Sequence, residues 1–282
     1  TLEKNILKRL AAGEQALLFL NRRGYAPVTV CNSCGGQVEC SKCDARLVYH
    51  RFLESLVCHQ CGYKQSVPVI CPKCSSKNSL APIGPGVERL AEECKLLFPN
   101  SKVEVLSSDL IEDVGSLRNV LSRISSGQTD IVIGTQLVSK GHNFPLLTLV
   151  GVIDADIGLE GGDLRASEKC FQMIRQVVGR AGRDSKPGEA LIQTWKSDHS
   201  IIRALLSNED EKFMQAESEL RSLAKVPPFG RMVSLIVSGI SEKKLFEFGF
   251  KIARDLNSLC NQRVQIYGPA AAPISKVKNR YR

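Results

Sequence analysis

Residues 130–145 read DIVIGTQLVSKGHNFP, and this stretch is the strongest indicator of the fold class. It opens with a short apolar run, which is typical of a strand buried on both faces of a sheet. The run ends at Gly134 and Thr135, and a loop containing a second glycine follows. Parallel sheets bind ligands in loops beyond the carboxyl ends of their strands. The stretch therefore predicts a strand of a ligand-binding parallel sheet.

Similar apolar runs lie on both sides of this stretch and predict the remaining strands. They occur at residues 15–20, 103–106, 148–154 and 190–194. Segments with helical patterns lie between or before them, at residues 3–12, 86–98, 113–125 and 167–178. Strands that alternate with helices predict an α/β fold with a parallel sheet covered on both faces.

Residues 31–74 differ in kind, because they are rich in turns and contain four C-x-x-C pairs. The pairs are Cys31/Cys34, Cys40/Cys43, Cys58/Cys61 and Cys71/Cys74. Two thiolates three positions apart on a tight turn can both bind one tetrahedral ion. Four pairs therefore predict two sites of four thiolates each, which we expect to hold two Zn²⁺ ions. Such closed sites are structural, because no coordination position remains for water or substrate.

Two other interpretations of the cysteines stay open at this point. Iron–sulfur ligation uses the same ligands, since spacing alone does not identify the metal. Thiol redox chemistry is typical of a single pair that opens a helix, and four pairs in turn-rich sequence do not favour it. His59 lies inside the third pair, and we expect it beside the ligands rather than among them. Cys94 and Cys170 lie on apolar helical stripes and are expected to be buried free thiols.

The charge of the chain is concentrated near its C-terminal end. Lys and Arg outnumber Asp and Glu by 38 to 29, and residues 225–282 alone hold 11 basic and 3 acidic residues. This excess predicts a polyanionic partner, although a basic surface also serves solubility. A Pro-Pro-Phe-Gly stretch at 227–230 marks the expected domain boundary. Beyond it we expect strands at 232–238 and 263–267 and a helix at 241–259.

Residues 176–183 read QVVGRAGR and follow the helix predicted at 167–178. Arg180 and Arg183 lie three positions apart beside glycines, so their side chains can project without crowding. Guanidinium groups suit phosphate oxygens, and an arginine finger stabilises the charge on a phosphoryl group in transfer. Alone, the motif could be surface charge. Together with the strand and loop at 130–145, it predicts a nucleotide half-site.

These motifs resemble those of a known family. GTQLVSKGHNFP resembles motif V and QVVGRAGR resembles motif VI of superfamily 2 helicases. The eight-cysteine insertion, preceded by LLFLNRRGYAP and followed by IGPGVERL, resembles the primosomal protein N′ (PriA) family of bacterial replication-restart DNA helicases. The resemblance covers nearly the whole chain. It implies an ATP-dependent 3′→5′ helicase that recognises stalled or branched forks and restarts replication through primosome assembly.

The resemblance also implies a domain organisation. Residues 1–30 and 75–224 would form the second RecA-like motor lobe, and 31–74 a double-zinc insertion. Residues 225–282 would begin a small, basic α+β C-terminal domain that continues beyond this chain. The sequence has no G-x-x-x-x-G-K-[ST] phosphate loop and no acidic magnesium-binding motif, which the family carries in its first lobe. We therefore expect a part of a longer protein that hydrolyses no ATP by itself.

Site residues follow from the same resemblance. Arg180 and Arg183 would be catalytic and contact the γ-phosphate of ATP, while ATP and Mg²⁺ are held mainly by the first lobe. Gln176 and Gly179 would lie at the nucleotide. Thr135 and Lys140 would lie by the DNA strand or the lobe interface. Asp154 and Asp156 follow a strand, and their interpretation as loop caps is as good as a functional one.

The implied partners are forked and single-stranded DNA, the single-stranded DNA-binding protein and other primosome proteins. The implied location is the bacterial cytoplasm, at the nucleoid, and no apolar run is long enough to predict a membrane span. The alternative function is a non-catalytic zinc-ribbon module that binds nucleic acid or protein. Phosphate-facing arginines favour the helicase, because a zinc-ribbon adaptor does not need them.

The cysteine pairs can combine into two sites in a sequential, an interleaved or a nested way. The 14 residues between Cys43 and Cys58 allow a small hairpin that closes one site. The first and last pairs would then close the insertion at its base. A sequential arrangement needs a tighter loop, of five residues, between Cys34 and Cys40. The nested arrangement, which the family resemblance also implies, is our prediction.

Overall fold

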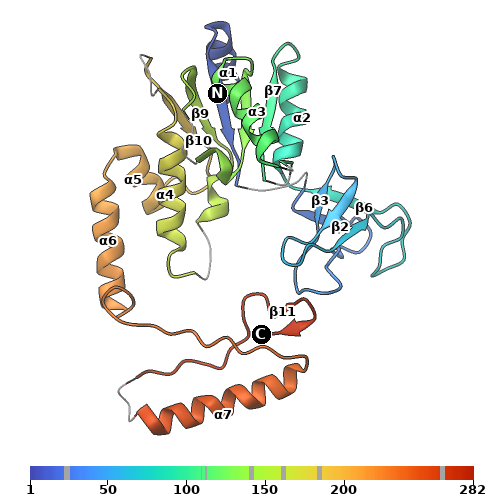
Figure 1. Ribbon diagram of the computed structural model, residues 1–282, viewed down its shortest axis with the longest axis vertical. Coiled ribbons are helices and arrows are strands. Elements are labelled where there is room, and N and C mark those ends of the chain that lie inside the picture. The colour runs from blue at the N-terminus through green and yellow to red at the C-terminus, as the bar shows by residue number, and fades with distance from the viewer. Residues whose placement is uncertain are drawn as a thin grey trace. The chain divides into compact units, whose positions relative to one another are not determined.

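The computed structural model describes residues 1–21, 26–108, 110–111, 113–139, 143–159, 163–182, 186–260 and 264–282. It divides into two compact units (Figure 1). The first unit comprises residues 1–26 and 85–231, and the second comprises residues 27–84 and 232–282. No helix among the described residues combines the length and apolar character that crossing a bilayer requires.

The first unit is built on a five-stranded sheet in the order β10-β9-β1-β8-β7, in which every pairing is parallel. Its strands are β1 (Gln15–Phe19), β7 (Val103–Leu106), β8 (Ile131–Gly134), β9 (Leu147–Val152) and β10 (Glu189–Ile192). Every residue of β1, β8 and β9 is buried. These three strands form the centre of the sheet, and burial on both faces explains why their sequences are continuously apolar.

Helices cover both faces of this sheet, which confirms the predicted fold class. Leu17 and Phe19 of β1 pack with α3 (Val114–Ser125), α4 (Ala166–Val178) and α5 (Ser200–Ser207). Leu18 and Leu20 point to the opposite face and pack with α1 (Leu2–Ala11) and α2 (Val87–Leu97). Successive side chains of a strand point to opposite faces, so one apolar run supplies two cores.

A further helix, α6 (Asp210–Leu223), follows α5 and is joined to α4 by specific contacts. Phe213 of α6 stacks on Phe171 of α4, with ring centroids 4.3 Å apart. Arg221 donates to the Glu168 carboxylate at 3.0 Å. The sequence patterns predicted neither α5 nor α6, whereas the predicted elements before them all occur within two residues of their expected bounds.

The second unit contains two small antiparallel sheets around the cysteines. Strand β2 (Val28–Cys31) pairs with β6 (Leu80–Ile83) and brings the two ends of the cysteine-rich segment together. Strands β3 (Val48–His50), β4 (Ser55–Val57) and β5 (Lys64–Ser66) form the other sheet. The two compact units differ from the three domains expected from sequence, whose boundaries stay a prediction.

The rest of the second unit is α7 (Glu242–Cys260) and a hairpin of β11 (Lys276–Val277) and β12 (Arg280–Tyr281). The predicted helix is confirmed. The strands predicted at 232–238 and 263–267 are wrong, because the described residues of both stretches lie in no strand. A strand requires a partner for its backbone groups. Along 232–238 such a partner is absent within the described residues, and Val233 is 86% exposed.

Candidate metal centres and nucleotide half-site

The eight cysteines of the C-x-x-C pairs form two clusters in the nested arrangement. Cys31, Cys34, Cys71 and Cys74 form the outer cluster, and Cys40, Cys43, Cys58 and Cys61 form the inner cluster. The Sγ atoms of Cys31 and Cys74 lie 3.6 Å apart, those of Cys34 and Cys71 3.8 Å, and those of Cys40 and Cys61 3.7 Å. Ligands about 2.3 Å from a tetrahedral ion lie about 3.8 Å from one another. Both clusters therefore have the chemistry and the spacing of a closed four-thiolate metal site.

The local turns orient these sulfur atoms. Backbone N–H groups donate to Sγ within three of the turns: Gly36 to Cys34, Lys42 to Cys40 and Lys73 to Cys71, at 3.3 to 3.4 Å. Such donors favour the thiolate form, which is the form that binds metal. Gly35 and Gly62, with φ of +68° and +76°, follow the second cysteine of their pairs, where the chain reverses in a conformation that favours glycine.

The thiols of the inner cluster do not ionise equally without a cation. Burial is the main cause that raises the pKa of Cys40 to about 12, whereas the N–H of Tyr63 is the main cause that lowers the pKa of Cys61 to about 7. A cation among the four sulfur atoms would favour the thiolate form of each. Metal binding must release protons, so its affinity falls as the pH is lowered.

The other predicted cysteines and His59 take the places expected for them. The Nε2 atom of His59 lies 3.2 Å from that of His50, a buried residue of β3, and His59 is not part of either cluster. Cys94 and Cys170 are buried in the first unit. Burial raises the pKa of Cys94 to about 12 and that of Cys170 to about 11, so both thiols stay protonated at neutral pH.

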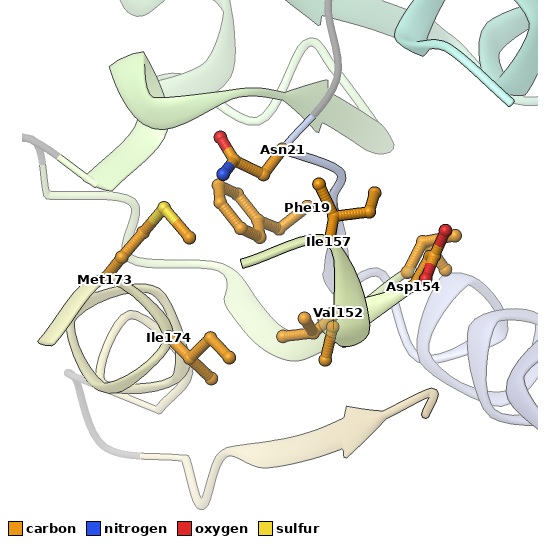
Figure 2. Close-up of a pocket in the computed structure, with 9 residues that line it drawn as sticks. Phe19, Asn21, Val152, Asp154, Ile157, Met173 and Ile174 are labelled. Atoms are coloured by element: carbon orange, nitrogen blue, oxygen red, sulfur yellow. The ribbon is translucent and has the colours of Figure 1, made fainter. Parts of the chain in front are cut away.

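The carboxyl edge of the parallel sheet contains Thr135 and a small pocket. Thr135 follows β8 and is 6% exposed. The pocket lies where β1 and β9 end and is mostly apolar; its lining is Phe19, Asn21, Val152, Ile153, Asp154, Ala155, Ile157, Met173 and Ile174. Figure 2 shows Met173 and Asp154 on opposite sides of it. Asp156 acts as a loop cap, because its carboxylate accepts a bond from the N–H of Trp195 at 2.8 Å.

The arginine motif lies at the opposite, amino edge. The N–H of Gly182 donates to the carbonyl of Leu147, the first residue of β9, at 2.9 Å. The Gly182 φ is +69°, and a Cβ there would lie 2.2 Å from the Gly188 nitrogen, so only glycine fits this turn. Helix α4 thus carries the chain across one face of the sheet, away from the edge where Thr135 lies.

The predicted site residues are therefore only partly brought together. Gln176 is exposed on the last turn of α4, Gly179 caps that helix, and Arg180 is 5% exposed. Arg183 and Lys140 lie outside the described residues. The arginine motif lies at the amino edge of the sheet, whereas Thr135 follows β8 at the carboxyl edge. The reason is topological, since a crossover helix begins at the carboxyl edge and ends at the amino edge.

A buried carboxylate beside the arginine motif was missed by sequence reasoning. Glu14 is 9% exposed and lies between α1 and β1. Its carboxylate accepts from the Thr148 hydroxyl at 2.6 Å and pairs with Arg9 at 3.2 Å and Lys186 at 3.0 Å. Lys186 follows the arginine motif, so Glu14 holds this loop at the amino edge. A single glutamate ahead of a strand has no pattern that could have revealed this role.

We expect Glu14→Gln to destabilise the first unit in a pH-dependent way. The Thr148 hydroxyl is the main cause that lowers the Glu14 pKa from 4.5 to about 2. A lowered folded-state pKa adds stability above pH 4.5, and this gain disappears as the pH falls toward 2. The difference in unfolding free energy between wild type and variant should be on the order of 1–3 kcal/mol at pH 7.

Urea unfolding followed by circular dichroism at several pH values between 7 and 3 measures this difference. Glu93→Gln is a suitable control, because Glu93 forms an exposed i,i+4 pair with Arg89 on α2. The difference in unfolding free energy between wild type and Glu14→Gln should shrink below pH 4.5. The corresponding difference for Glu93→Gln should be close to zero at every pH. A Glu14→Gln difference that grows on acidification would contradict the assignment.

Two family models match parts of the chain. Residues 222–282 match the primosomal protein N C-terminal domain, and residues 40–65 match the PriA DNA helicase Cys-rich region domain. Among solved structures, domain 2 of the DEAD-box helicase Mss116p bound to an RNA duplex matches at 12% identity and covers 92% of this chain and 70% of that chain. Its TM-score of 0.38 is too low to support an inference.

Curated relatives match over nearly the whole chain. Replication restart protein PriA of Rickettsia conorii is 43% identical over 270 residues, which are 95% of this chain and 41% of that protein. PriA of Bacillus subtilis is 38% identical over 281 residues, covering 100% of this chain and 35% of that protein. PriA of Haemophilus influenzae is 38% identical, and the match covers 100% of this chain and 39% of that protein. This chain spans about two fifths of the length of these relatives.

The parallel sheet and the cysteine-rich insertion define an α/β protein with two four-cysteine clusters, each of which could hold a metal ion. The matches to the two domain models and to the curated relatives point to one family more closely. Over nearly its whole length this chain is similar to proteins of the PriA family, the family that its motifs resemble.

Proposed function

We propose that this chain is part of an ATP-dependent 3′→5′ DNA helicase that recognises stalled or branched replication forks and restarts replication by primosome assembly. The proposal rests on one observation: the same chain contains both the double four-cysteine module and the QVVGRAGR motif. Its similarity to proteins named replication restart protein PriA supports the proposal. Residues 1–30 and 75–224 are then the second motor lobe, 31–74 the double-zinc insertion, and 225–282 part of the C-terminal domain.

In this function Arg180 and Arg183 stabilise the charge on the γ-phosphate, and ATP and Mg²⁺ are held mainly by the first lobe. Gln176 and Gly179 lie at the nucleotide, and Thr135 and Lys140 face DNA or the lobe interface. The close approach of Gly182 to Gly188 and the pairing of Lys186 with Glu14 support this assignment. They give the arginine motif a rigid base, and a rigid base keeps the reorganisation cost of catalysis low.

The metal of both cysteine clusters is, in this proposal, Zn²⁺. The donor set of four sulfur atoms suits zinc, and a zinc ion with four thiolates supplies folding energy rather than chemistry. The cysteines of the outer cluster would close the module where β2 and β6 pair. Those of the inner cluster would hold the β3-β4-β5 sheet, whose strands have three residues each.

The proposed partners are forked and single-stranded DNA, single-stranded DNA-binding protein and other primosome proteins in the bacterial cytoplasm, at the nucleoid. The basic excess of residues 225–282 supports the DNA contact. The two metal centres also suit a second candidate, a non-catalytic zinc-ribbon module that binds nucleic acid or protein. Unwinding of a forked duplex with a 3′ single-stranded arm distinguishes the candidates. The whole protein should unwind it with ATP, and failure to do so would favour the second candidate.

We expect this chain alone to hydrolyse no ATP, because its sequence lacks a phosphate loop and a magnesium-binding motif. A coupled assay with single-stranded and forked DNA measures phosphate release from the purified chain. The whole protein serves as the positive control in the same assay. DNA-stimulated turnover by the chain alone would require another nucleotide site and would overturn this assignment.

A further inference from the structure

The turn at Cys40 and Cys43 is built differently from the other three cysteine turns. In the others, the residue after the second cysteine donates its N–H to the carbonyl of the first cysteine. The bonds are Gly35 to Cys31 at 2.8 Å, Gly62 to Cys58 at 2.8 Å and Ser75 to Cys71 at 2.9 Å. All three donors have positive φ. Asp44 takes this position in the fourth turn, and its N–H instead donates to the Lys276 carbonyl at 2.8 Å.

Lys276 belongs to the β11–β12 hairpin, which also reaches the open turn with two backbone donors. The N–H of Lys278 donates to the Cys43 Sγ at 3.4 Å, and that of Asn279 to the Lys42 carbonyl at 2.8 Å. The Ser275 hydroxyl donates to the Asp44 carboxylate at 2.7 Å. Four bonds therefore join residues 275–279 to residues 42–44, across more than 230 positions of sequence.

The backbone of the hairpin turn is strained in a way that its contacts explain. Lys278 and Asn279 have φ of +51° and +60°, the conformation of a type I′ turn. A lysine rarely adopts this conformation, which persists only where the surroundings determine it. Here the turn aims two N–H groups at the cysteine loop. Val277 packs against the core around the inner cluster, which includes Cys40 and Cys43.

We propose that the hairpin of residues 275–281 is the closing segment of the inner metal centre, so that metal binding by this centre and docking of the hairpin are coupled. The Lys278 N–H bonds to a ligand sulfur, and this bond is stronger when the sulfur is a metal-bound thiolate than when it is a thiol. Linkage makes the coupling reciprocal, so a docked hairpin also strengthens metal binding. Neither metal binding by the inner centre nor docking of the hairpin requires helicase activity.

The coupling has a consequence for the basic C-terminal region. Lys276, Lys278, Arg280 and Arg282 lie on or directly after the hairpin strands and turn. Their positions therefore depend on the state of the inner metal centre. The outer cluster differs, because its turns at Cys31/Cys34 and Cys71/Cys74 close on themselves. Within the described part of the chain, the hydrogen bonds of the hairpin do not reach the outer cluster, so the outer cluster serves as an internal control.

Hydrogen exchange of the zinc-loaded chain tests the coupling at the amides of Lys278 and Asn279. We compare Cys58→Ser in the inner centre with Cys71→Ser in the outer centre, since both thiols are buried first members of their pairs. Cys58→Ser should speed exchange of the hairpin amides by about tenfold or more. Cys71→Ser should leave them within about twofold, well below the usual range of coupling. Equal protection of these amides in both variants would overturn the proposal.

A second variant separates the hairpin from the fold of the metal module. Asp44→Gly permits the positive φ of the other turns, so the fourth turn can close on itself, and it removes the acceptor of Ser275. We expect this variant to retain two Zn²⁺, while its hairpin amides exchange faster and a chelator removes one zinc about tenfold faster. Ser75→Gly is the matched control, because Ser75 already has φ of +60°. Unchanged exchange and zinc release in Asp44→Gly would show that the hairpin does not close the centre.

Discussion

Arg183→Ala in the whole protein is expected to lower the kcat of DNA-stimulated ATP hydrolysis by about 10²- to 10⁵-fold. In the proposed mechanism Arg183 donates to the γ-phosphate, where charge develops during phosphoryl transfer. Its loss therefore raises the barrier to hydrolysis and changes ATP binding little, because the first lobe holds most of the nucleotide. Steady-state kinetics gives kcat, and a fluorescent ATP analogue gives the dissociation constant in the same preparation.

Arg203→Ala is the matched control for this experiment. Arg203 is an exposed arginine of α5 whose ion pair with Asp198 is also exposed, so its removal should leave kcat unchanged. Arg180→Ala is expected to be as damaging as Arg183→Ala. Because Arg180 is buried, the thermal unfolding midpoint of the Arg180→Ala variant must also be measured, to separate an effect on catalysis from an effect on folding. An unchanged kcat for Arg183→Ala would mean that Arg183 supplies surface charge alone.

Removal of both metal ions is expected to unfold the cysteine-rich module while the parallel lobe stays folded. The module has few apolar residues to replace the metal, since its buried core consists of three cysteines with Val38, Leu47 and Leu56. Four-thiolate zinc sites contribute apparent binding free energies of about 10–16 kcal/mol at pH 7, more than so small a core supplies. The lobe has two separate apolar cores of its own.

Zinc analysis, followed by amide spectra before and after chelation, measures this effect. Two zinc ions per chain are expected, and Cys40→Ser or Cys31→Ser should each lose one. After chelation, amides of β3, β4 and β5 should lose their dispersed resonances, while those of β1, β8 and β9 keep theirs. A module that remains folded without metal would contradict a structural role for zinc. Redox activity of the metal-free thiols would instead favour the oxidoreductase interpretation.

Local pattern was sufficient for most of the first unit. Strands such as β8 and β9 are buried on both faces. Their continuous apolar sequences predict this burial without any information about the strands and helices that pack against them. The helical periods of α2 and α4 are equally local. The C-x-x-C spacing predicted which residues could hold metal. Two cysteines three positions apart on one turn can bind the same ion, and this geometry depends only on a few neighbouring residues.

The sequence pattern did not predict the structure where that structure depends on partners that are distant along the chain. Residues 232–238 are apolar, yet they form no strand, since a strand needs hydrogen-bonding partners that the sequence of the segment does not contain. The edge at which the arginine motif lies follows from the path of a crossover helix. Glu14 became part of this region only because Thr148 and Lys186, more than 130 residues away, meet its carboxylate.

The sequence by itself thus determined the α/β class, the resemblance to the PriA family, the eight cysteines that form the two clusters and the helix that precedes Arg180, since each rests on short-range periodicity or spacing. Only the tertiary structure decided that the four cysteine turns are not equivalent. Asp44 looks like an ordinary loop residue in the sequence, and Lys278 like one of many basic residues near the C-terminal end. Their backbone groups meet at the inner metal centre because folding satisfies buried hydrogen-bonding groups wherever partners come together, regardless of their separation along the chain.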